Sequence, residues 1–190
     1  MNSKSLYSSI VAAALCLFCL HSLSAVQKAE TEPNSKELVF NKKIGTLIKG
    51  ETTDFEKKSP GLGMSVGYNA PGITLTVYKY NMGLKKIAPD PSSEMLTKHF
   101  RAIQQNIYSL EKQGKYKSVK EIMTETADIG NKKKAHHTIF EYIQTGKKRM
   151  SHMYLWANNN FFIKVRYTYD VERIDEAERN LELILRDLSK

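Results

Sequence analysis

Hydrophobic residues near the middle of the chain recur with the period of two that is typical of half-buried strands. Ile73, Leu75 and Val77 alternate with two threonines and a tyrosine. A second β-rich run covers 64–68, and between the two runs 69–72 contains a Pro-Gly pair suited to a tight turn. The pattern predicts a hairpin with strands at 64–68 and 73–80.

Two later segments carry apolar residues every three or four positions, the spacing of one helix face. For the first we expect Asp90 to act as the N-cap, Pro91 to occupy the first helical position and Gly114 to end the helix, which places it at 91–112. For the second we expect Asp170 to be the cap. Its apolar stripe consists of Ile174, Ala177, Leu181, Ile184 and Leu188.

Further strand patterns lie before the hairpin and between the helices. Short candidates are 38–40 and 44–48, and longer ones are 118–125, 135–144, 148–157 and 161–167. Strands joined by hairpins form antiparallel sheets, because parallel pairs need crossover connections. The sequence therefore predicts an α+β class, with an antiparallel sheet covered by two amphipathic helices in an α/β/α sandwich.

The run Gly72 to Ile87, GITLTVYKYNMGLKKI, is followed by the predicted helix and then by KQGKY at 112–116. In this order of elements the chain resembles the PsbP-like superfamily, which includes DcrB-like exported bacterial proteins of unassigned function. The resemblance implies the α/β/α sandwich and an adaptor or envelope-maintenance role. It carries no catalytic motif and assigns no site residue.

The N-terminus has the pattern of a cleaved secretory signal. Lys4 precedes an apolar run at 10–20 that is too short to span a bilayer comfortably, and small residues up to Ala25 suit signal-peptidase cleavage. We predict a signal peptide at 1–25, a flexible leader at 26–36 and one domain at 37–190. The mature chain is then expected to be periplasmic or secreted, with no transmembrane segment.

Both cysteines lie inside the predicted signal, so the mature chain has none for disulfides, thiol catalysis or metal binding. Without Lys4 it holds 28 Lys and Arg against 20 Asp and Glu, a net charge of +8. Such a charge favours anionic partners, although lysines also solvate turns and protect sheet edges. The candidate residues for binding an anionic partner are Lys132, Lys133, Lys134, Lys147, Lys148 and Arg149.

Catalytic and cofactor signatures are weak or absent. Ser65 stands in the letters G-x-S-x-G, but a turn precedes it and a strand follows, whereas a hydrolase elbow opens a helix. His137 and His152 are expected to be diagonal neighbours across a hairpin, and with Glu141 they could hold a metal, but the pattern favours ordinary surface or half-buried imidazoles. No phosphate loop occurs, and we expect no cofactor and no metal.

Together these features predict an exported, non-enzymatic envelope protein that binds or scaffolds another envelope component, with basic loops favouring anionic partners. Two alternatives remain: a small envelope hydrolase using Ser65, and a secreted factor acting on a host. Tyrosines interleaved with Lys and Arg could stack nucleic-acid bases, but export argues against a nucleic-acid partner.

Overall fold

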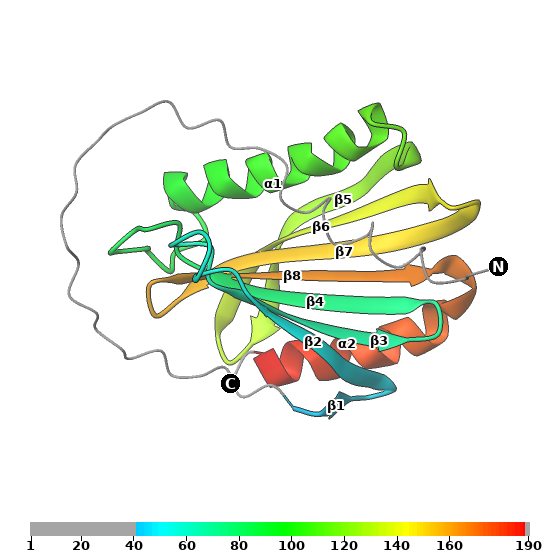
Figure 1. Ribbon diagram of the computed structural model, residues 1–190, viewed down its shortest axis with the longest axis horizontal. Coiled ribbons are helices and arrows are strands. Elements are labelled where there is room, and N and C mark those ends of the chain that lie inside the picture. Colours follow the sequence, from blue (N-terminus) through cyan, green and yellow to red (C-terminus); the bar gives the residue numbers. More distant parts are fainter. Residues whose placement is uncertain (1–40, 189–190) are drawn as a thin grey trace. The chain divides into compact units, whose positions relative to one another are not determined.

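The computed structural model describes residues 41–188. Eight strands form one antiparallel sheet in the order β1-β2-β3-β4-β8-β7-β6-β5 (Figure 1). The predicted α+β class and antiparallel sheet are thus confirmed. The predicted signal peptide, the leader and the strand candidate 38–40 lie outside the described residues. The strands are β1 (Lys43–Ile44), β2 (Leu47–Asp54), β3 (Met64–Ala70), β4 (Ile73–Tyr80), β5 (Lys117–Gly130), β6 (Lys133–Gln144), β7 (Lys147–Asn158) and β8 (Phe161–Asp170).

The last four strands are joined by two-residue turns in which both residues have positive φ, the geometry of type I′ hairpins. These turns are Asn131-Lys132 (φ 50° and 59°), Thr145-Gly146 (51° and 80°) and Asn159-Asn160 (49° and 61°). Because such turns need only two residues, the ladders continue further than the sequence pattern predicts. β5 therefore extends to Gly130 rather than ending at residue 125.

The predicted single strand at 44–48 is wrong, because the chain reverses at Gly45 and Thr46. Gly45 has φ +58°, and a Cβ on it would lie 2.0 Å from the Oδ1 atom of Asn180. That same oxygen accepts a hydrogen bond from the Thr46 amide at 3.1 Å. The buried Asn180 of the last helix thus requires a glycine here, and the strand divides into β1 and β2.

Helix α1 (Glu94–Lys112) starts three residues later than predicted. Ser93 is its N-cap and accepts from the Leu96 amide, so the expected cap at Asp90 is wrong. The Asp90 carboxylate instead accepts from the amide and hydroxyl of Ser92, both at 2.8 Å. A local turn therefore uses the carboxylate before the helix begins.

Helix α2 (Ile174–Leu188) follows a turn of 3-10 helix at Val171–Arg173. Asp170 precedes this turn but makes no side-chain capping bond, which corrects its predicted role. Ile174, expected in the apolar stripe, is exposed, whereas the polar Asn180 is buried. Binding of Asn180 to the β1–β2 turn explains why a polar side chain lies on the packed face of this helix.

Two hydrophobic clusters form the core, and each helix packs against one of them. The cluster that contains α1 includes Phe162, and the cluster that contains α2 includes Ile163 and Val165, so successive residues of β8 alternate between the two. Helix α1 lies over β5, β6 and β7 (Figure 1). Within residues 41–188, no helix combines the length and the apolar character needed to cross a membrane.

Candidate functional site

The turns β5–β6 and β7–β8 lie at one end of the sheet, together with the loop 81–93 that leads from β4 to α1. This follows from the up-and-down order of the last four strands, in which alternate turns share an end. A hydrogen bond from the Ile87 amide to the Asn160 side chain, 3.2 Å long, ties the loop to the β7–β8 turn. Three chain segments that are distant in sequence thus meet here.

A cavity of about 280 Å³ opens between these segments. We call it the lysine pocket. Lys132 and Lys134 are exposed and Lys133 is half-buried. None of the three forms an ion pair with an acidic residue in the described part of the chain, so no carboxylate contact balances their charges. The residues that line the pocket are Pro89, Pro91, Lys132, Lys133, Lys134, Trp156, Ala157 and Asn158.

Trp156 lines the pocket, and its ring packs in the hydrophobic cluster that contains α2. Its side chain is 2% exposed, and its Nε1 atom has no hydrogen-bond partner in the structure as described. The indole N–H can only donate, and a buried donor without an acceptor costs about 1–3 kcal/mol. The lysine ammonium groups can only donate, so a ligand with negatively charged oxygen atoms would satisfy them.

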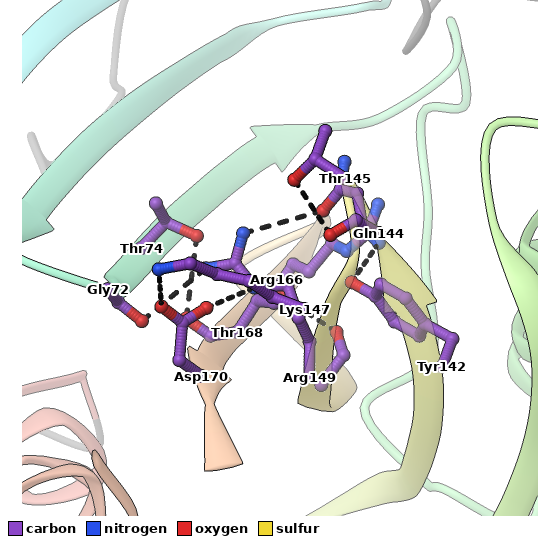
Figure 2. A network of polar contacts seen from close by, with 11 residues as sticks. Gly72, Thr74, Tyr142, Gln144, Thr145, Lys147, Arg149, Arg166, Thr168 and Asp170 are labelled. Carbon is purple, nitrogen blue, oxygen red and sulfur yellow. Dashed lines mark hydrogen bonds and ion pairs between the residues drawn. The ribbon is translucent and has the colours of Figure 1, made fainter. Parts of the chain in front are cut away.

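The second predicted basic cluster lies at the opposite end of β6, so the six candidate residues do not form one surface. Lys147 Nζ lies 3.0 Å from a carboxylate oxygen of Asp170, and Arg149 Nε lies 3.1 Å from the other (Figure 2). Lys148 Nζ pairs with Glu141 at 2.9 Å. All three charges of this cluster are therefore balanced within the chain.

The Asp170 network holds the sheet together at this end (Figure 2). The Asp170 side chain is 8% exposed, and its amide donates to the Gly72 carbonyl at 2.8 Å. Arg149 also donates to that carbonyl, at 3.4 Å. Gly72 has φ +72°, and a Cβ there would come within 2.9 Å of Asp170 Oδ2. The Pro-Gly turn between β3 and β4 is thereby fixed to the start of the last helix.

Ser65 lies in the second position of β3, paired with Thr53 and Tyr78 on the neighbouring strands. A strand continues after it, so the strand-to-helix turn of a hydrolase elbow is not formed at this serine. Among residues 41–188, no hydrogen bond joins Ser65 to a histidine. The structure gives the hydrolase alternative no geometric support.

His137 and His152 contact each other, as their predicted diagonal placement requires: His137 Nε2 and His152 Nδ1 are 3.2 Å apart. The acidic neighbour differs from the expected Glu141, because Glu125 lies 3.3 Å from His137 Nδ1. His152 Nε2 in turn lies 3.2 Å from the Tyr169 hydroxyl. Their ring nitrogens are used by these neighbours, and in the described part of the chain no group of three or more His, Cys, Asp or Glu could hold a metal ion.

No family model matches the sequence, and neither does any curated protein. Solved structures do match. CyanoP, the PsbP protein of Synechocystis sp. PCC 6803, is similar over 76% of this chain and 92% of its own, with 14% identity and a TM-score of 0.49. LpqN of Mycobacterium tuberculosis, which is involved in cell envelope biogenesis, is similar over 75% of this chain and 82% of its own, with 11% identity and a TM-score of 0.39.

PA94 of Pseudomonas aeruginosa, a protein of unknown function, is similar over 58% of this chain and 68% of its own, with 10% identity and a TM-score of 0.36. The likeness to PsbP that the order of elements predicts is therefore found among solved structures. Similarity at this level carries no information about function.

The sequence pattern predicts the lysines of the pocket as binding residues, but it does not indicate that Pro89, Pro91 and Trp156 line the same cavity. The signal that could have found them is the series of hairpins. In a four-stranded meander the first and third turns share an end, which places the β5–β6 lysines beside the end of β7, where Trp156 lies.

Proposed function

We propose that this protein is an exported, non-enzymatic envelope protein that binds an anionic envelope component through the lysine pocket. The observation that carries the proposal is the contrast within the predicted basic residues. Those at 147–149 have acidic partners, while Lys132, Lys133 and Lys134 have none in the described part of the chain and line a cavity. Export rests on the signal pattern at 1–25, and the net positive charge supports an anionic partner.

We also propose the α/β/α sandwich as the scaffold for this site, with one helix on each face of the sheet. It is supported by the two separate hydrophobic clusters, each of which contains one helix. In this arrangement the turns at the ends of the strands are the parts left available to a partner. The lysine pocket lies at one of these ends of the sheet.

The test compares binding to vesicles of phosphatidylglycerol with binding to vesicles of phosphatidylcholine, measured by co-sedimentation at rising salt. The variant Lys132→Ser/Lys134→Ser removes two unpaired charges from the pocket. Near an anionic surface each lysine contributes about 1 kcal/mol, so we expect affinity for the anionic vesicles to fall by about 30-fold. Binding of the unaltered protein should also weaken as salt screens the charges.

The matched control is Lys147→Ser/Lys148→Ser, which removes the same number of charges at the opposite end of β6. We expect it to lower affinity by less than about threefold, because its lysines already interact with acids. Circular dichroism confirms that both variants are folded. Equal losses in the two variants, or binding that salt does not change, would contradict the proposal.

Cell fractionation tests the compartment of the protein separately from its binding. Antibody detection of the protein in the periplasmic fraction is expected for an envelope resident. Recovery in the culture medium would instead support the secreted, host-directed alternative. Retention in the cytoplasm at full length would overturn export altogether.

A further inference from the structure

Two basic residues of β8, Lys164 and Arg166, lie away from both predicted basic clusters. They alternate with Val165 and Tyr167, which are buried in the cluster that contains α2. Lys164 and Arg166 therefore point to the other face of the sheet, the face that carries Phe162 and α1. Both are half-buried rather than fully exposed.

Aromatic side chains, not acids, surround these two cations. The Lys164 Nζ atom lies 3.9 Å from the centre of the Tyr78 ring. Arg166 donates from one Nη atom to the hydroxyls of Tyr116 at 2.8 Å and Tyr142 at 3.2 Å. Neither cation forms an ion pair with a carboxylate among residues 41–188. The two charges are thus stabilised by ring faces and neutral oxygen atoms only.

The Arg166 guanidinium carries more donors than these tyrosines use. Both of its hydrogen bonds to Tyr116 and Tyr142 leave from the same Nη atom, whereas a guanidinium has five N–H groups. Beside Tyr142, the hydroxyls of Ser151 and Thr168 bind each other at 2.8 Å. Figure 2 shows Tyr142, Arg166 and Thr168 close together at this place on the sheet. A group with several acceptor oxygens and negative charge would bind the remaining N–H groups of Arg166.

The titration behaviour of the neighbours agrees with a positive field. Burial and the charge of Arg166 lower the pKa of Lys164 to about 8, and burial and the charge of Lys164 lower the pKa of His99 to about 4. His99 is therefore neutral at pH 7 and adds no second positive charge. For Tyr142, burial is outweighed by the charge of Arg166 and by hydrogen bonds from Thr168, so its pKa is lowered.

Part of this face reaches solvent. Helix α1 lies over β5, β6 and β7, whereas the cations belong to β8, next to β4. On β4 the paired residues Thr76 and Tyr78 are half-buried, and Thr74, one step further along, is exposed. A small anion can therefore approach the two cations from the β4 side.

We propose that Lys164 and Arg166 form a binding site for a phosphate group, carried either by a soluble phosphate ester or by a lipid headgroup. Their Cα atoms are about 7 Å apart on one face of a strand, so the two charges belong to the same region of this face. The guanidinium plane and the ammonium point charge are the two forms of cation that proteins use for phosphate. The site is separate from the lysine pocket and does not depend on it.

Isothermal titration calorimetry with sn-glycerol 3-phosphate tests the soluble arm, and co-sedimentation with vesicles of phosphatidic acid tests the lipid arm. Both use the whole protein and the variants Lys164→Met and Arg166→Gln. We expect each variant to weaken binding about tenfold or more in the arm that binds, since each removes a charged contact. Binding in the first arm identifies a soluble ester, and binding in the second arm alone identifies a headgroup.

The control Lys148→Met removes a lysine that pairs with Glu141, and it should leave phosphate binding unchanged. Lys132→Ser/Lys134→Ser should also leave sn-glycerol 3-phosphate binding unchanged, which separates this site from the lysine pocket. Loss of binding equal to that of Lys164→Met in either control would overturn the proposal. So would the absence of binding in both arms.

Thermal unfolding without ligand supplies a second readout. If Lys164 is kept for a ligand, its unpaired charge costs stability, and Lys164→Met should raise the melting temperature by about 2–6 °C. If Lys164 serves only the fold through its contact with Tyr78, the same variant should lower the melting temperature. A fall would overturn the proposal even where binding measurements were prevented by misfolding.

Discussion

The two ends of β6 carry runs of basic residues that look alike in sequence but differ in their acidic partners. At one end Lys132, Lys133 and Lys134 line a cavity and have no acidic partner in the described part of the chain. At the other end Lys147 and Arg149 converge on one buried carboxylate. A basic cluster is therefore available to a partner only where the fold supplies no acidic residue to pair with it.

The position of the acid decides this difference. Asp170 ends β8 and precedes the last helix, where it is 6% exposed. A buried carboxylate must be paired, because desolvation of an isolated charge costs several kcal/mol. No comparable buried carboxylate lines the lysine pocket. The comparison therefore predicts stability effects at the Asp170 end and binding effects at the lysine pocket.

The largest expected effect is that of Asp170→Asn. It leaves Arg149, which is 17% exposed, with no acidic partner at that contact, so the free energy of unfolding should fall by about 3–5 kcal/mol. Urea unfolding followed by circular dichroism measures it. Glu141→Gln is the control: it breaks only the pair with the well-exposed Lys148 and should cost less than about 1 kcal/mol. Equal losses in the free energy of unfolding for Asp170→Asn and Glu141→Gln would contradict the larger effect expected of the buried carboxylate.

His152 is a buried base whose hydrogen-bond neighbours are His137 and the Tyr169 hydroxyl, whereas Glu125 pairs with His137. Burial and the nearby His137 lower the pKa of His152 to about 4. The unfolded chain binds this proton near pH 6.5, so between those values it holds more protons than the folded chain. Stability is therefore full above pH 6.5 and is lost as the pH falls towards 4.

We expect His152 to account for about 2–3 kcal/mol of that acid loss. The measurement is the free energy of unfolding by urea at pH 7, 6, 5 and 4. His152→Gln should flatten the curve over this range, whatever its stability at pH 7. The groups that surround His152 are His137, Tyr154, Tyr167 and Tyr169, with Glu125 beyond His137. An unchanged slope in the variant would contradict this assignment.

The smallest expected effect on stability belongs to the lysine pocket. Lys132→Ser/Lys134→Ser should change the free energy of unfolding by less than about 0.5 kcal/mol, because neither side chain is buried or paired. Lys147→Ser should cost up to about 1 kcal/mol, because it removes one exposed partner of Asp170. A loss above 2 kcal/mol in the lysine pocket variant would show that these lysines serve the fold instead.

Local patterns in the sequence determined most of the elements. Alternation along 73–80 and helical spacing along 91–112 predict β4 and α1, because each follows from which side chains one face can bury. Boundaries were less predictable. Asp90 and Ser93 both suit an N-cap, and only the geometry of the turn at Ser92 decides between them. Similarly, nothing local indicates that Asn180 fills the space beside Gly45.

The sites depended on tertiary structure to a greater degree. The sequence by itself determined an α+β chain rich in lysine, with basic residues concentrated at turns and without a phosphate-loop motif. Only the fold decided that Asp170 reaches Lys147 and Arg149, that Trp156 lies beside Lys132–134, and that Lys164 and Arg166 face tyrosines rather than acids. The physical reason is that the identity of a residue fixes its charge, whereas the partner that balances this charge comes from another strand.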